Sequence, residues 1–144
     1  MVDEDYKISD IKYIMNSREY AEKILILREE ETKKDWPEYD KELFIQAEKI
    51  VIGIFRQNSI YPSISVSDGQ ELIFFWKAGV NTIEISLQDG DFFIANRSEN
   101  KEPEIIEGKY SAFPYGRMFH ILSDYTQYVS NVNRDWKSLF TEVV

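Results

Sequence analysis

The stretch of residues 62–96 constrains the fold of this chain most, because apolar and polar side chains alternate along it with a period of two. Three turn signals interrupt the alternation at regular intervals: Asp68-Gly69, Ala78-Gly79 and Asp89-Gly90. Dipeptides of this kind between alternating runs are typical of β-hairpins. The stretch predicts an antiparallel meander with strands at residues 63–67, 71–77, 80–88 and 91–96, and a further short strand at 104–107.

Helical periodicity flanks this meander on both sides. Residues 17–34 form the first predicted helix, with Asn16 as its cap and Glu19 three residues on. Its apolar stripe consists of Tyr20, Ala21, Ile24, Leu25 and Leu27. A second helix is predicted at residues 38–57 with Pro37 in its first turn, where proline is favoured. We expect it to be the most buried helix, because Ile45 and Ile52, which lie off its apolar stripe, widen a long apolar face. The stripe consists of Leu43, Phe44, Ala47, Ile50, Val51, Ile54 and Phe55.

A third predicted helix covers residues 115–132, where apolar residues recur at steps of three and four. Residues 8–15 and the pair Leu139 and Phe140 suggest two further short helices. The sequence therefore predicts one α+β domain over residues 1–144, with residues 1–15 as a loosely ordered arm. It has two N-terminal helices, a four- to five-stranded antiparallel meander sheet, and a C-terminal helix packed on one sheet face.

The two faces of the predicted sheet differ in composition. One face is apolar throughout and should contact the helices through Phe74, Trp76, Ile83 and Ile85. The other face is polar along the third strand, at Glu84 for example, yet carries Ile73, Phe75 and Phe93. Large apolar side chains on an outer sheet face are either covered by another segment of the chain or available to a partner. Here the N-terminal segment is the candidate cover.

Charge and cysteine content restrict the function. Seventeen basic residues face 26 acidic ones, a net charge of −9. The electric field of this negative charge repels nucleic acid and favours a basic partner. The alternative is that the charge serves only to keep the protein soluble. The absence of cysteine excludes disulfides and thiolate chemistry. The acidic N-terminus lacks the pattern of a signal peptide, and no long apolar run predicts a membrane span. We expect a cytoplasmic protein.

Few residues carry catalytic chemistry. The single histidine, His120, has Asp124 four residues on and Arg117 three before it, but no nucleophile is evident beside it. We therefore predict no catalytic residues, no cofactor and no metal site, and a surface position for His120. Aromatic residues cluster between Lys109 and Phe119, namely Tyr110, Phe113, Tyr115 and Phe119. They either pin this segment to the core or form a binding surface.

The strand region resembles a loose set of small uncharacterised bacterial proteins. The resemblance rests on Pro62-Ser63-Ile64-Ser65, Asp68-Gly69, Phe75-Trp76, Gly79 and Ile83-Glu84-Ile85. It consists of a proline-led strand, an Asp-Gly turn, a strand ending in tryptophan and a glycine turn. Some of these proteins look like companions of a second small protein, as in toxin–antitoxin or defence-type gene pairs. The resemblance thus implies a partner-binding role.

Four functional hypotheses follow. The leading one is a non-enzymatic protein-binding accessory or neutralising factor that contacts a basic partner through Ile73, Phe75, Phe93, Glu84 and Tyr115. A sharper version is nucleic-acid mimicry by the carboxylates of Asp3, Glu4, Asp5, Glu29, Glu30 and Glu31. The rival is an enzymatic or small-ligand domain with His120, Asp124 and Tyr115 converging on a pocket near residues 109–124. The last is a homodimer or other homo-oligomer formed by the outer face or an edge strand.

Overall fold

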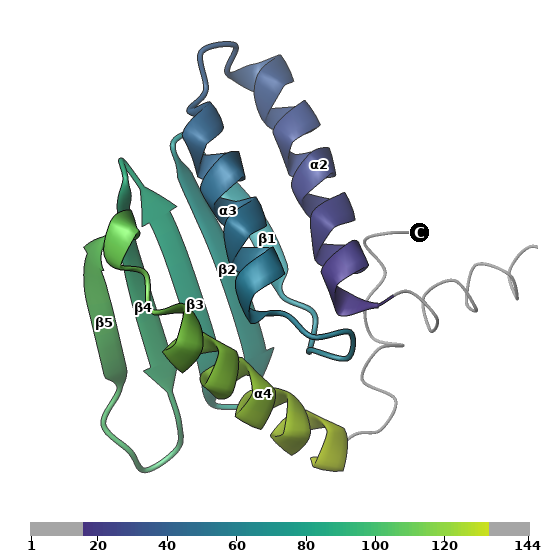
Figure 1. Cartoon of the computed structure of the whole chain (residues 1–144), viewed down its shortest axis with the longest axis vertical. Helices are drawn as coiled ribbons and strands as arrows, with labels where there is room; N and C mark the ends of the chain where they lie inside the picture. Colours follow the sequence, from purple (N-terminus) through teal and green to yellow (C-terminus); the bar gives the residue numbers. More distant parts are fainter. Residues whose placement is uncertain (1–15, 133–144) are drawn as a thin grey trace, which may run out of the picture.

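The computed structural model describes residues 16–132, which form a five-stranded antiparallel sheet with three α-helices on one of its faces (Figure 1). In chain order the elements are α2 (Ser17–Asp35), α3 (Lys41–Ile54), β1 (Ser63–Ser67), β2 (Glu71–Ala78), β3 (Asn81–Gln88), β4 (Asp91–Arg97), β5 (Glu104–Lys109), a 3-10 turn η1 (Tyr110–Ala112) and α4 (Tyr115–Val132). The predicted α+β class, with its meander sheet, is confirmed. The predicted segments at residues 8–15 and at Leu139 and Phe140 lie outside the described residues.

Turn chemistry fixes the order of the strands. Both residues of two hairpin turns have positive φ: 52° and 71° at Asp68 and Gly69, and 52° and 78° at Asp89 and Gly90. Left-handed backbone at both central positions matches the twist of the flanking strands, and Asp-Gly adopts it at low cost. These two turns pair β1 with β2 and β3 with β4, and the order of the whole sheet is β1-β2-β3-β4-β5.

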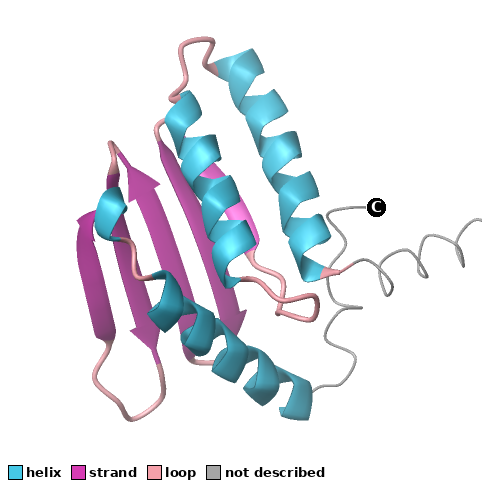
Figure 2. Cartoon of the chain, viewed as in Figure 1, coloured by secondary structure: helices cyan, strands magenta, loops and turns pink. Residues whose placement is uncertain are grey.

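The core lies between the sheet and the helices, all of which cover the same face (Figure 2). One row across this inner face joins Phe74, Ile85, Ile94 and Ile106. Trp76 is 1% exposed, and its indole Nε1 donates a hydrogen bond of 2.9 Å to the carbonyl oxygen of Ile60. The prediction that the face bearing Phe74 and Trp76 contacts the helices is confirmed by their burial.

The helix starts follow side-chain caps. Asn16 accepts a hydrogen bond of 2.9 Å from the backbone N–H of Glu19, as predicted. The predicted start of α3 is wrong. Pro37 lies in the preceding turn, and Asp40 caps the helix by accepting from the N–H of Glu42 at 3.0 Å. Aspartate is among the preferred caps, so it sets the boundary here in place of the proline.

The prediction that α3 is the most buried helix is confirmed among the described helices: seven of its 14 residues are buried, against six of 19 in α2 and five of 18 in α4. The extents of two apolar faces differ from the prediction. Ile45 and Ile52 of α3 are 47% and 51% exposed, because the sheet and the neighbouring helices leave one side of α3 open to solvent. Leu27 of α2 is 44% exposed. Arg28, about 100° further round the helix, points toward the sheet in its place.

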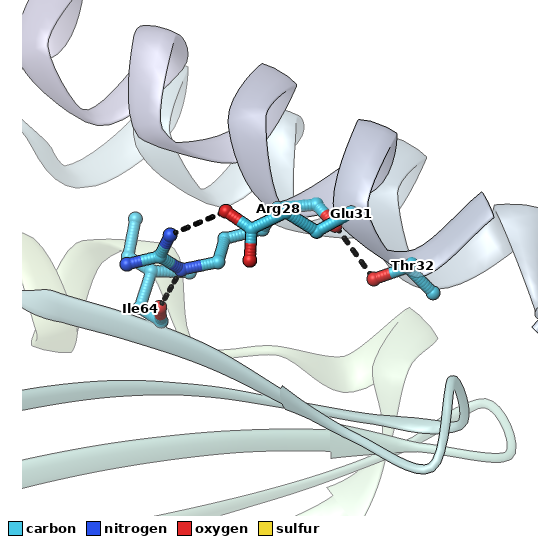
Figure 3. Close-up of polar contacts among 4 residues, drawn as sticks. All are labelled: Arg28, Glu31, Thr32 and Ile64. Carbon is cyan, nitrogen blue, oxygen red and sulfur yellow. Dashed lines mark hydrogen bonds and ion pairs between the residues drawn. The ribbon is translucent and has the colours of Figure 1, made fainter. Parts of the chain in front are cut away.

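Arg28 links α2 to the sheet edge formed by β1 (Figure 3). Its Nε donates to the carbonyl oxygen of Ile64 at 2.7 Å, and its Nη1 pairs with Glu31 at 3.0 Å. The hydroxyl of Thr32 donates to the carbonyl oxygen of Arg28 at 2.6 Å. An edge strand offers unpaired backbone groups to other chains. On β1, the Arg28 side chain satisfies one of those groups, the carbonyl of Ile64.

Candidate partner-binding surface

The outer face of the sheet is the face opposite the helices. Strand register places its side chains in rows that cross the sheet, because directly opposed residues of antiparallel strands point to the same side. One row contains Ser63, Phe75, Glu84, Ala95 and Ile105, and the next contains Ser65, Ile73, Ser86, Phe93 and Glu107. Ile73, Phe75, Phe93 and Glu84, four of the five residues expected to contact a partner, are therefore brought together.

Apolar side chains of β2, β4 and β5 flank the polar central strand β3 on the outer face. Ile73, Phe75 and Phe93 are each half-buried, and Ile105 at the edge of the sheet is 46% exposed. No helix among residues 16–132 covers this face (Figure 2). Residues 1–15 of the N-terminal segment that was expected as a cover lie outside the described residues. Ile105 was missed by the sequence analysis because the polar loop before β5 hides the register of that strand. It lies beside Ala95, which is 0% exposed, and adds a large apolar side chain at the β5 edge.

Carboxylates surround one end of the outer face. A shallow depression of about 310 Å3 there has Phe93 in its lining together with five acidic residues: Glu71, Glu84, Asp89, Asp91 and Glu107. The hydroxyl of Ser86 donates to Glu71 Oε2 at 2.9 Å and so orients that carboxylate. Only Asp91 of the five has a described ion pair, with Lys109 at 3.0 Å. The opposite end carries Lys77 and Arg97 flanking Thr82, so the charge across the face is polarised.

Tyr115, the fifth expected contact residue, lies elsewhere. It begins α4 on the helical side of the sheet, where its ring packs against Gly53 and its hydroxyl is hydrogen-bonded to that of Tyr110. Phe113 is 6% exposed and meets Phe92 edge to face with ring centroids 5.3 Å apart. Burial and the Tyr115 contact raise the pKa of Tyr110. These aromatic residues pin the segment after β5 to the core.

The three polar groups expected to form an enzymatic pocket do not converge. His120 is exposed on α4, as predicted, and contacts the ring of Phe119 edge to face at 5.9 Å. A depression nearby is lined by Asp124 and Arg117, but not by His120 or Tyr115. Arg117 is engaged there by Glu104 through two hydrogen bonds of 3.0 and 2.7 Å. This bidentate contact lowers the pKa of Glu104.

The acidic run on α2 is largely engaged by neighbouring side chains. Glu29 accepts from the Tyr39 hydroxyl at 2.8 Å, Glu30 lies 3.8 Å from Lys33, and Glu31 pairs with Arg28. Asp3, Glu4 and Asp5 lie outside the described residues. Within residues 16–132 no cluster of three or more acidic or histidine side chains is arranged to hold a metal ion. None of the helices described there has the length and apolar character that crossing a membrane requires.

Comparison of the chain with protein-family models, with curated proteins and with solved structures finds no match. The resemblance of the strand region to small bacterial proteins therefore stays a prediction.

Proposed function

We propose that this protein is a non-enzymatic binding factor that recognises a basic protein partner through the outer face of its sheet. One observation carries the proposal: Ile73 and Phe75 of β2, Phe93 of β4 and Ile105 of β5 are on a sheet face that no described helix covers. Antiparallel sheets ordinarily keep an uncovered face polar. Several large apolar side chains on such a face are typical of interaction sites.

The dimensions of the face suit a protein interface. Five strands about 4.8 Å apart and up to eight residues long give an area of about 24 Å by about 26 Å. That is about 600 Å2, most of the about 800 Å2 that one partner contributes to an interface of standard size. A small ligand would leave most of this surface exposed to water.

Charge supports a basic partner. Four carboxylates beside Phe93 (Glu71, Glu84, Asp89 and Glu107) make no ion pair within residues 16–132. Carboxylates beside apolar side chains accelerate association with a positively charged surface and exclude acidic competitors. A neutralising companion of the antitoxin, inhibitor or defence-related kind, acting in the cytoplasm, agrees with this surface and with the resemblance noted above.

The test is co-purification from a nuclease-treated lysate of the native host, comparing wild-type protein with the Phe75→Asp and Val80→Asp variants. Val80 is 63% exposed in the β2–β3 turn and is the matched control. We expect a stoichiometric basic protein with wild type and Val80→Asp, and at least an about tenfold loss with Phe75→Asp. Equal recovery with a folded Phe75→Asp variant would contradict the proposal.

A homodimer is the second candidate, and the two edges of the sheet favour one route to it. Arg28 engages the β1 edge, whereas the β5 edge bears Ile105, 46% exposed, with no such contact among the described residues. Pairing of two β5 strands would continue the sheet. Sedimentation equilibrium distinguishes the two candidates, because only the homodimer gives twice the chain mass without a partner.

A further inference from the structure

A groove between α2 and α3 lies apart from the outer sheet face. Its lining is apolar at the centre, with Leu25 and Ile26 from α2 and Phe44 and Ile45 from α3. Leu25 and Phe44 are 5% and 6% exposed and form the floor. Ile26 and Ile45 are 61% and 47% exposed and form the walls. Isolated exposed isoleucines are ordinary, but here two of them face one groove.

Three glutamates complete the lining: Glu22 and Glu29 of α2, and Glu48 of α3. Glu22, Ile26 and Glu29 recur at helical spacing, so they follow one side of α2. Glu29 is held in place by the hydroxyl of Tyr39, whose pKa is raised to about 12 by burial and by this hydrogen bond. No described side chain pairs ionically with Glu22 or Glu48, and the lining contains no basic residue.

The occupant has to bring its own backbone hydrogen bonds. Both walls are α-helices, whose N–H and C=O groups are bonded within each helix except at the ends. The backbone N–H and C=O groups of an extended segment would therefore find no hydrogen-bond partners in the groove. A helix avoids this cost, because its interior backbone groups already bond to each other. The groove has a volume of about 200 Å3, below the about 300–1,000 Å3 of small-molecule sites, and suits single anchoring side chains.

We propose that the α2–α3 groove binds a cationic amphipathic helix of a partner protein. An aliphatic or aromatic anchor of that helix packs on Leu25 and Phe44, between Ile26 and Ile45. Lysine or arginine residues flanking the anchor contact Glu22 and Glu48. Laying an apolar helix face in a groove between helices is a recurrent mode of recognition. This site does not depend on the outer sheet face, because the helical layer and the sheet separate the two.

The test uses a fluorescent peptide of about 14 residues, the length of α3, with leucines on one helical face and lysines flanking them. Its counterpart has glutamate in place of every lysine. Fluorescence anisotropy at low salt measures binding to the full chain and to the Ile26→Asp, Glu48→Gln and Leu27→Asp variants. Leu27 is 44% exposed on α2 outside the groove and is the matched control. Far-UV circular dichroism verifies that each variant is folded.

We expect Ile26→Asp to weaken binding of the cationic peptide at least about tenfold, and Leu27→Asp to change it less than about twofold. Glu48→Gln should weaken it about two- to fivefold at low salt and flatten its salt dependence. The proposal is overturned if wild type fails to bind the cationic peptide, if the glutamate peptide binds equally well, or if Ile26→Asp and Leu27→Asp are equivalent. It is also overturned if sedimentation shows a dimer that Ile26→Asp dissociates, because a second copy would then fill the groove.

Discussion

Replacing Trp76 with alanine tests the packing of the sheet against the helices. The side chain is 1% exposed, and its ring lies near Phe55 and Phe74, with centroids 6.0 and 6.1 Å away. Loss of a fully buried tryptophan costs about 3–5 kcal/mol through lost burial and the cavity that remains. This is a large share of the about 5–15 kcal/mol that stabilises a typical domain.

Two further variants separate the contributions of the hydrogen bond and of burial to this loss of stability. Trp76→Phe keeps a ring but removes the 2.9 Å hydrogen bond to the Ile60 carbonyl, so we expect a smaller loss of about 1–2 kcal/mol. Trp36→Ala makes the same change as Trp76→Ala at a residue 46% exposed, and should cost less than half as much.

Urea unfolding followed by far-UV circular dichroism measures all three variants. With a slope of about 2 kcal/mol per molar urea, Trp76→Ala should lower the midpoint by about 2 M. A loss below about 1 kcal/mol would refute the assignment of this sheet face to the core, because surface substitutions produce effects of that size.

Three further predictions concern individual contacts. Gly53→Ala would place a methyl carbon 2.5 Å from the Tyr115 ring and should cost about 1–3 kcal/mol in urea unfolding, a loss that disappears in a Tyr115→Ala background. Arg28→Ala should lower the free energy of unfolding by about 1–2 kcal/mol, because a strand carbonyl loses its donor; an unchanged midpoint would contradict this role. The lowered pKa of Glu104 contributes stability that is present above its unfolded value and is lost as pH falls through its folded value. Arg117→Gln should therefore raise the Glu104 pKa in a carbon NMR titration, and an unshifted titration would show that the contact is not formed in solution.

The sheet could be predicted because its signals are local. Asp68-Gly69 and Asp89-Gly90 need positive φ at both positions, and Asp-Gly supplies it. Once the turns are placed, the period of two assigns every side chain to a face. The facing of Trp76 and of Phe75 followed from that rule without any information about the helices. Only the facing of Ile105 escaped it, because six residues of irregular loop separate β4 from β5.

The helical layer was less predictable because its contacts are tertiary. Periodicity identifies an apolar side of α3 but cannot say how much of that side the neighbours cover. Ile45 was expected to widen the apolar face of α3, and it is 47% exposed. On α2, Arg28 faces the sheet where Leu27 was expected to do so. This orientation depends on a hydrogen bond to a carbonyl of β1, 36 residues away in sequence. The α2–α3 groove is formed by residues of both helices, so the sequence of either helix alone could not predict it.

The most direct test of the proposed role of the outer face uses the absence of cysteine in this chain. A single Ser65→Cys variant places a unique thiol on the outer face opposite Ile73, and Ser111→Cys places a control thiol on the exposed η1 turn. The rate of maleimide labelling is measured for each variant, free and in the purified complex with the co-purified partner. We predict that partner binding slows labelling at position 65 at least about tenfold and leaves position 111 unchanged, because a buried interface core excludes the reagent. Unchanged labelling at position 65 in a stoichiometric complex would contradict the central claim.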